Sequence, residues 1–240
     1  MAALFVSDLH IPPEGGAACD ALERFLARVP RPGDSLYVLG DLFEYWAGDD
    51  DIDAPGNRRV VDLLAANARR GIEQFWIAGN RDFLAGAAFM RQAGMSALTE
   101  PSVRELSGEK TVLLHGDVLC TDDQAYQAFR RQARTPAWRQ AFLARPLGQR
   151  LADIRAMRAT SEHEKSVKSM DIMDVNTNAV LALIESTEAT RMIHGHTHRP
   201  ARHDGELNGR AFRRWVLPAW EIAPGYLRVD ASGDRLLPVD

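Results

Sequence analysis

The chain has 240 residues, 45% of them hydrophobic and 26% charged, and a formal net charge of −4. This length allows a sizeable core in one domain, and the composition excludes a disordered or fibrous protein. The weak negative charge gives no sign of a nucleic-acid partner. The two cysteines, Cys19 and Cys120, indicate neither a disulfide framework nor a thiolate metal site, so a reducing cytosol fits best. No apolar run reaches the ~18 residues that span a bilayer, and the first one stops at Asp8, unlike a signal peptide.

The first half of the chain alternates between strand and helix patterns. Short apolar runs at 2–6, 36–39 and 74–78 predict buried strands, and helical spacing of apolar residues at 19–29 and 58–70 predicts helices between them. A short helix at 84–93, a fourth strand at 111–114 and a fifth strand ending at Ile193 continue the pattern. This alternation predicts an α/β fold.

Each predicted strand is followed by a side chain that can bind a metal. These side chains, in chain order, are Asp8 and His10, Asp41, Asn80, His115, and His196 with His198. A lone aspartate after a strand is more often a helix cap, and a lone histidine more often a core residue, but five consecutive strand ends are hard to explain in that way. Because functional sites of α/β folds lie beyond the carboxyl ends of the strands, we predict a metal centre at this edge. His194 precedes the turn at Gly195 and is interpreted as a packed core histidine.

The chemistry of these ligands favours a two-metal site. Oxygen and nitrogen donors without thiolate suit manganese, iron or zinc. Seven ligands are too many for one tetrahedral ion, whereas two ions that share Asp41 would use them all. Two metals about 4 Å apart can polarise a phosphoryl group and generate a nucleophile from water. The residues therefore predict a hydrolase of a phosphate ester or anhydride.

The segment 124–170 has no strand pattern and is strongly basic. It holds ten lysines and arginines against three acidic residues, and Leu147, Leu151 and Ile154 share one helix face. We interpret it as a helical cap over the metal edge, whose apolar face around Leu147 and Leu151 admits acyl chains. The alternative is a solvated basic surface with an ordinary core stripe. After it, a helix is predicted at 171–186, and apolar runs at 215–217, 226–229 and 236–237 predict strands of a second sheet.

The order and spacing of five motifs resemble the calcineurin-like metallophosphoesterases. The motifs are Asp8-Leu9-His10, Gly40-Asp41, Gly79-Asn80, His115-Gly116-Asp117 and Gly195-His196-Thr197-His198. The resemblance implies a four-layer α-β-β-α sandwich with a helical cap insertion. It also implies one metal on Asp8, His10, Asp41 and His198, and a second on Asp41, Asn80, His115 and His196.

Longer matches resemble one branch of that family, the UDP-2,3-diacylglucosamine pyrophosphatases of the lipid A pathway. They include Gly79-Asn80-Arg81-Asp82-Phe83-Leu84, Ile172-Met173-Asp174-Val175-Asn176 and Gly195-His196-Thr197-His198-Arg199-Pro200. The resemblance implies hydrolysis of UDP-2,3-diacylglucosamine with two Mn²⁺ ions per chain, on the cytoplasmic face of the bacterial inner membrane, by a peripheral monomer. It implies one domain, 1–240, with the cap at about 122–169.

The same resemblance implies two sets of site residues. The catalytic residues would be Asn80, Arg81, His115 and His196. The substrate contacts would be Asn80, Arg81, Asp123, Ser161, Lys165, Lys168 and His196. Two alternatives remain open: another dinuclear phosphoesterase, acting on phosphoproteins, dinucleoside polyphosphates or nucleic acid, and a metal-free scaffold that binds proteins.

Overall fold

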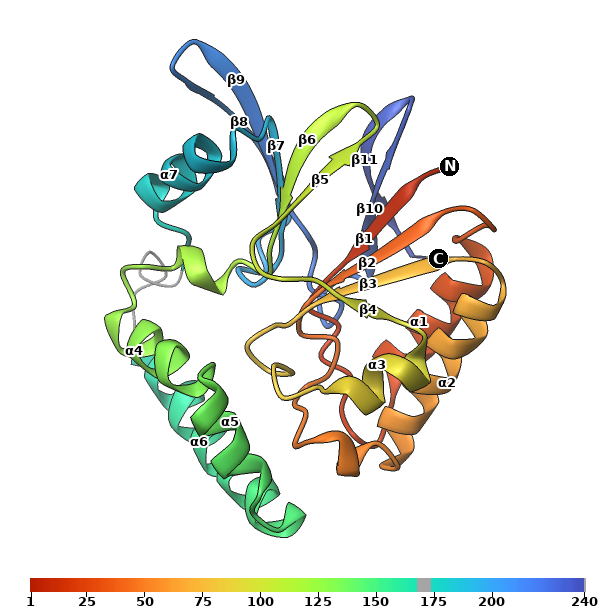
Figure 1. The fold of residues 1–240 in the computed structure, drawn as a ribbon, viewed down its shortest axis with the longest axis vertical. Coiled ribbons are helices and arrows are strands. Elements are labelled where there is room, and N and C mark those ends of the chain that lie inside the picture. Colours follow the sequence, from red (N-terminus) through yellow and green to blue (C-terminus); the bar gives the residue numbers. More distant parts are fainter. Residues whose placement is uncertain (168–173, 240) are drawn as a thin grey trace.

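The computed structural model describes residues 1–167 and 174–239, without the side chains of 160–167. Within these residues, strands with a parallel centre form two mixed sheets that face each other (Figure 1). The first sheet has the order β11-β10-β1-β2-β3-β4. Its strands are β1 (Ala3–Val6), β2 (Ser35–Leu39), β3 (Glu73–Ile77), β4 (Ser96–Ala97), β10 (Gly225–Asp230) and β11 (Gly233–Pro238).

The second sheet has the order β5-β6-β7-β9-β8. Its strands are β5 (Ser102–Leu106), β6 (Glu109–Leu113), β7 (Arg191–His194), β8 (Ala201–Leu207) and β9 (Arg210–Val216). The helices are α1 (Ala17–Arg28), α2 (Pro55–Arg69), α3 (Ala87–Ala93), α4 (Gln124–Ala133), α5 (Pro136–Leu143), α6 (Leu147–Val167) and α7 (Thr177–Thr187). Helices α1–α3 cover the outer face of the first sheet and α7 covers that of the second (Figure 1). The predicted α-β-β-α sandwich is confirmed.

Alternation along the strands explains why the sheets stack. In β1, Leu4 and Val6 point toward α1–α3, whereas Phe5 points between the two sheets. There Phe5 stacks on Tyr37 of β2, with ring centroids 4.8 Å apart. Trp215 of β9 enters the same layer from the other sheet. Since both faces of these strands are buried, their sequences are nearly continuous apolar runs.

Three details differ from the sequence-based expectations. The tail does not form one separate sheet: β9 joins the second sheet, but β10 pairs with β1 and β11 with β10. The helix expected at 171–186 begins later within the described residues, because the Asn176 side chain caps it by accepting from the backbone N–H of Asn178. Strands β5 and β8 were not predicted, since exposed, polar residues dominate both.

The segment expected to be a cap forms α4, α5 and α6, which lie apart from the sheets (Figure 1). Its apolar side chains are less open than expected: Ile154 is buried, and Leu147 and Leu151 pack against the core beneath the first sheet. Part of its positive charge is also neutralised by ion pairs. Side chains that pair with carboxylates are Arg130, Arg134, Arg145, Arg150 and Arg158.

No helix within residues 1–167 and 174–239 combines the length and hydrophobicity needed to cross a bilayer.

Candidate metal centre

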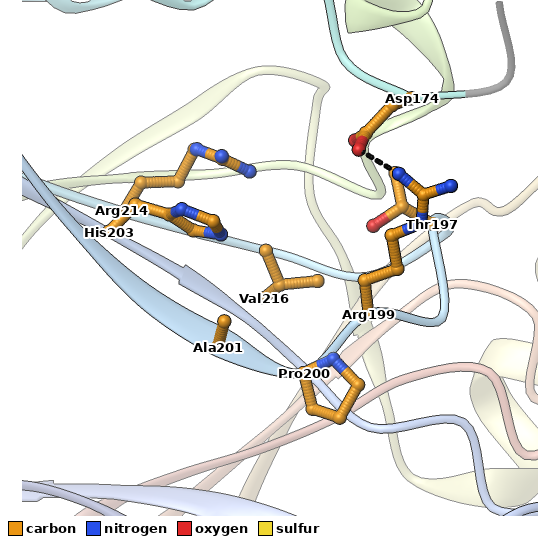
Figure 2. Close-up of a pocket in the computed structure, with 8 residues that line it drawn as sticks. All are labelled: Asp174, Thr197, Arg199, Pro200, Ala201, His203, Arg214 and Val216. Atoms are coloured by element: carbon orange, nitrogen blue, oxygen red, sulfur yellow. Dashed lines mark hydrogen bonds and ion pairs between the residues drawn. The ribbon is translucent and has the colours of Figure 1, made fainter. Parts of the chain in front are cut away.

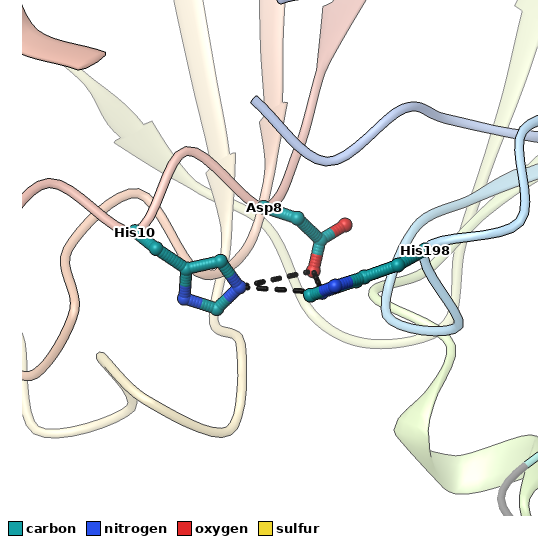
Figure 3. A group of neighbouring side chains, drawn as sticks. All are labelled: Asp8, His10 and His198. Carbon is teal, nitrogen blue, oxygen red and sulfur yellow. Dashed lines mark hydrogen bonds and ion pairs between the residues drawn. The ribbon is translucent and has the colours of Figure 1, made fainter. Parts of the chain in front are cut away.

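The carboxyl ends of β1, β2 and β3 meet those of β6 and β7 at one edge of the sandwich, and the ligand-type side chains gather there. Asp8, His10 and His198 form one group (Figure 3). His10 Nε2 and His198 Nε2 are 3.3 Å apart, and Asp8 Oδ1 lies 3.4 Å from His198 Nε2. Three donor atoms from the first and fifth predicted strand ends therefore converge on one point.

A second group adjoins the first through the carboxylates. Asp8, Asp41 and His115 place donor atoms within 4.8 Å of one another, and Asp41 Oδ2 lies 3.9 Å from His10 Nε2 and 3.6 Å from His115 Nε2. The Asn80 side-chain oxygen lies 2.9 Å from both His115 Nε2 and His196 Nδ1. The structure thus brings together all seven residues predicted as metal ligands, with Asp41 between the two halves.

Each carboxylate is fixed by one oxygen and presents the other. Asp8 Oδ2 accepts a hydrogen bond from the backbone N–H of His196 at 2.8 Å, while Asp8 Oδ1 is buried with no hydrogen-bond partner among the described residues. Asp41 Oδ1 accepts from the backbone N–H of Arg81 at 2.8 Å. His115 Nδ1 donates to the Leu39 carbonyl at 2.8 Å, which orients Nε2 toward Asp41 and Asn80. An orphaned carboxylate oxygen beside oriented imidazoles fits divalent cations.

The backbone at this edge is strained. Positive φ angles occur at five of the predicted ligands: Asp8, His10, Asp41, His196 and His198. Such conformations cost about 1–3 kcal/mol each and persist where the surroundings enforce them, most often at functional sites. Glycines make the close approach possible. A Cβ on Gly79 would lie 2.0 Å from Asp41 Oδ1, and one on Gly195 2.1 Å from Asp8 Oδ2.

Burial and mutual charge perturb the ionisation of these groups. Burial raises the pKa of Asp41 to about 7, against the opposing effect of His115. Burial lowers the pKa of His10 to about 3 despite the nearby Asp8 carboxylate. For His115, burial is outweighed by the Asp41 and Asp8 carboxylates, which raise its pKa to about 9. Buried carboxylates and imidazoles this close need compensating charge, which bound cations would supply.

Sequence reasoning missed several residues that support the ligands. Asp82 is fully buried and accepts from the backbone N–H groups of Gly79 at 2.8 Å and Leu42 at 2.9 Å, so it ties two ligand loops together. Glu44 Oε2 lies 3.4 Å from His10 Nδ1. Asp82 stands inside the motif from Gly79 to Leu84 quoted above, which was the available signal for it.

A second supporting network reaches from the ligand loops to α4. The backbone N–H of His115 donates to Glu100 at 2.7 Å, and Arg130 of α4 pairs with both Glu100 and Asp117. Arg134 donates to the Gly79 carbonyl at 2.8 Å. No pattern in the sequence marks Glu100, because it lies in a loop and acts only through its position in the fold.

The structure describes only some of the remaining predicted site residues. The Arg81 side chain is half-buried, near enough to influence the pKa of His10. Asp123 caps α4 by accepting from the backbone N–H of Tyr126 at 3.1 Å. The side chains of Ser161 and Lys165, and all of Lys168, lie outside the described residues. His194 is fully buried, and its Nε2 lies 3.0 Å from Arg214 Nη1, in keeping with a core histidine.

An α-β-β-α sandwich whose strand ends converge on carboxylate, amide and imidazole donors defines a metallophosphoesterase. The chain belongs to the calcineurin-like phosphoesterase family, whose model matches residues 1–200. Membership implies binding of divalent metal, and the two residue groups at the sheet edge are its candidate ligands.

Three curated relatives carry the name UDP-2,3-diacylglucosamine hydrolase. The relative from Aromatoleum aromaticum is 48% identical over 97% of this chain and 95% of its own length. Those from Escherichia coli O7:K1 and Aeromonas hydrophila are 45% and 48% identical, over 99% of this chain and 98% of theirs. The similarity therefore extends through the insertion and the C-terminal strands as well as the family core.

Proposed function

We propose that this protein hydrolyses the pyrophosphate bond of UDP-2,3-diacylglucosamine in lipid A biosynthesis. The products are 2,3-diacylglucosamine 1-phosphate and UMP. The observation that carries the proposal is the 45–48% identity, over nearly the whole chain, to relatives named for that substrate. The convergent ligands at the sheet edge supply the chemistry that such a hydrolysis needs.

Two Mn²⁺ ions are the proposed cofactors. Asp8, His10, Asp41 and His198 would hold one ion, and Asp41, Asn80, His115 and His196 the other. When bound, such ions act as Lewis acids on the phosphoryl group and lower the pKa of water. The protein's part is to orient the donors: backbone N–H groups hold Asp8 and Asp41, and the Leu39 carbonyl sets the His115 tautomer.

Arg81 is proposed to stabilise negative charge on the phosphoryl group as water attacks the α-phosphorus. Its backbone is anchored on both sides, because its N–H donates to Asp41 and its carbonyl accepts from the Trp46 N–H at 3.1 Å. A guanidinium carried on this anchored backbone can bind phosphoryl oxygens through two parallel hydrogen bonds. A sugar phosphate is a good leaving group, so a fixed cation is more useful here than a general acid. Asn80 and His196 complete the proposed catalytic set with His115.

The segment of α4, α5 and α6 is proposed as a cap that receives the diacylated sugar. Phe129, Leu143 and Met157 keep a third or more of their surface exposed, and with the half-buried Leu147 and Leu151 they offer apolar surface for acyl chains. Asp123, Ser161, Lys165 and Lys168 are the proposed polar contacts. The protein would act as a monomer in the cytoplasm, peripherally on the cytoplasmic face of the bacterial inner membrane.

Hydrolysis in heavy-oxygen water tests substrate, metal and site of attack together. The metal-stripped protein is incubated with UDP-2,3-diacylglucosamine, with and without manganese, and the masses of the products are measured by mass spectrometry. We expect manganese-dependent release of UMP that carries the heavy oxygen. Cleavage of only a generic phosphodiester would retain the metal site but reject the lipid substrate, in favour of another phosphoesterase.

A further inference from the structure

A pocket with several polar side chains in a largely apolar lining adjoins the metal centre on the side of α7. It has a volume of about 220 Å³ and lies between the loop that precedes α7 and the β8–β9 hairpin. Figure 2 shows Asp174, Thr197 and Arg199 on one side of it and His203 and Arg214 on the other. Thr197 stands between the predicted ligands His196 and His198, so the pocket and the metal centre share one loop. No side chain of the described part of α4–α6 lines it.

Two groups in this pocket lack the partners that their burial calls for. Thr197 Oγ1 is shielded from solvent and has no hydrogen-bond partner among the described residues. Arg214 is half-buried and lies within reach of the charge of Asp174, but it forms no ion pair with a described carboxylate. It uses Nη1 for His194 at 3.0 Å, which leaves its other N–H donors for the pocket. Unpaired donors in a cavity are expected to meet a polar ligand.

Size and chemistry narrow the class of ligand. A cavity of about 220 Å³ lies below the ~300–1,000 Å³ of drug-sized ligand sites, so it suits a ring-sized polar group rather than an acylated sugar. Arg214, Thr197 and His203 offer hydrogen-bond donors. Asp174, which pairs with Arg199, offers carboxylate lone pairs as acceptors. Uracil matches this arrangement, because it presents two carbonyl acceptors on either side of one N–H donor.

We propose that this pocket binds the uridine end of the substrate while the scissile phosphate lies at the metal centre. The proposal rests on the proposed function and assigns the nucleotide half of that substrate. The loop from His196 to His198 then serves both halves of the reaction: its imidazoles face the metal centre and Thr197 faces the nucleoside. The acylated sugar extends toward the α4–α6 cap, away from this pocket.

Ligand titrations of the full-length, manganese-loaded protein test the proposal without relying on turnover. Isothermal titration with uridine, UMP and inorganic phosphate is carried out on the wild type, Arg214→Met and Thr197→Val. Arg202→Ala is the matched control, because Arg202 neighbours His203 on β8 but lies over Trp215 on the opposite face. Metal content and thermal unfolding are measured for each variant. His203→Ala changes an exposed position, so it adds a variant that leaves the core intact.

We expect Arg214→Met to lower the affinity for uridine and for UMP about tenfold, because one charge-assisted hydrogen bond is lost. Thr197→Val and His203→Ala should lower these affinities less. Phosphate affinity should change much less, and Arg202→Ala should match the wild type. Equal affinities for uridine in all proteins would overturn the proposal. A phosphate affinity that falls as much as that of UMP would also overturn it, because the pocket would then be a phosphate site.

Kinetics separate this proposal from the proposed function. In the pocket variants, KM for UDP-2,3-diacylglucosamine should rise more than KM for bis(p-nitrophenyl) phosphate, which has no nucleoside. An equal rise for both substrates would mean that the variants disturb the ligand loop, and would contradict a uridine site. Failure of the wild type to cleave UDP-2,3-diacylglucosamine would reject the proposed function, while the uridine titrations would still decide whether the pocket binds nucleoside.

Discussion

The sheet edge that carries the candidate metal ligands and the α4–α6 segment differ in how strictly their residues are constrained. At the edge, strained residues and glycines with no room for a Cβ hold the candidate ligands in one arrangement. In α6, by contrast, a Cβ on Gly148 would meet no atom within 4 Å. The segment is held to the body by one apolar face and by arginine pairs such as Arg150 with Asp50. The edge therefore demands particular residues at particular positions, whereas the segment demands a pattern of apolar and charged faces.

The largest effect is expected from removing a ligand at the centre of the edge. His115→Ala should abolish turnover, by more than about 10³-fold, because His115 Nε2 is a donor that no neighbour replaces. Steady-state kinetics with metal analysis by mass spectrometry measures this, and bound manganese should fall as well. Near-normal turnover would contradict the two-metal assignment.

The next effect concerns charge stabilisation. Arg81→Ala should lower kcat about 10²–10³-fold and raise KM much less, because its interaction is expected to strengthen as phosphoryl charge develops. Arg81→Lys keeps the charge but loses the planar guanidinium, so its kcat should lie between those of the wild type and Arg81→Ala. A rise in KM with unchanged kcat would instead make Arg81 a binding residue only.

Two matched glycine substitutions compare the regions directly. Gly79→Ala should destabilise the fold by about 1–3 kcal/mol and reduce metal binding, since the new methyl group overlaps Asp41. Gly148→Ala, in the helix of the segment, should stabilise it by about 0.4–1 kcal/mol. Urea unfolding of both variants measures the difference. Equal effects would contradict the distinction between a rigid edge and a tolerant segment.

A smaller effect is expected where the segment joins the body. Arg150 is buried and donates to Asp50 at 2.9 Å and to the Arg145 carbonyl at 2.9 Å. Arg150→Met should cost about 1–2 kcal/mol of unfolding free energy, because Asp50 stays solvated after the loss. Its activity on bis(p-nitrophenyl) phosphate should stay near that of the wild type. A large loss there would mean that the segment also shapes the metal edge.

The smallest effect is expected in the alkylation rate of Cys120, which lies between the sheet edge and α4. Burial raises the pKa of the Cys120 thiol to about 12, with the Asp117 carboxylate adding to it. At pH 9 the native thiol should therefore stay protonated and react slowly with iodoacetamide, whereas the unfolded chain should ionise and react fast. Mass spectrometry of timed samples measures both rates, with Cys19 of α1 as the buried control. Rapid native labelling of Cys120 alone would show that the junction opens readily.

Much of the edge could be predicted because its signals are local. Each candidate ligand lies just after its strand in the sequence, as Asp41 follows β2 and His115 follows β6, so a pattern of apolar run and polar end was sufficient to place it at this edge. Glu100 and Arg130 could not be found in this way. Their hydrogen bonds join segments about 15 or 30 residues apart, and neither residue stands in a motif.

Sheet membership also escaped prediction. Apolar runs reveal that β10 and β11 are strands, but the partner of an apolar strand is set by packing across the sandwich. Here β10 adds to β1 at the edge of the first sheet, with Leu227 paired to Phe5. The free charge of the basic segment could not be judged from the sequence for a related reason, since net charge does not tell which arginines pair with carboxylates in the fold.

The sequence by itself determined the α/β class and the gathering of the candidate ligands at one edge, and it predicted the insertion between the strands. These depend on periodicity and on side chains adjacent to strand ends, which are local properties of the chain. Only the tertiary structure decided which sheet each strand joins, which acids support the ligands and where the pocket beside Thr197 lies. Those features arise from contacts between residues distant in sequence, and the energies of such contacts depend on geometry that composition and spacing do not encode.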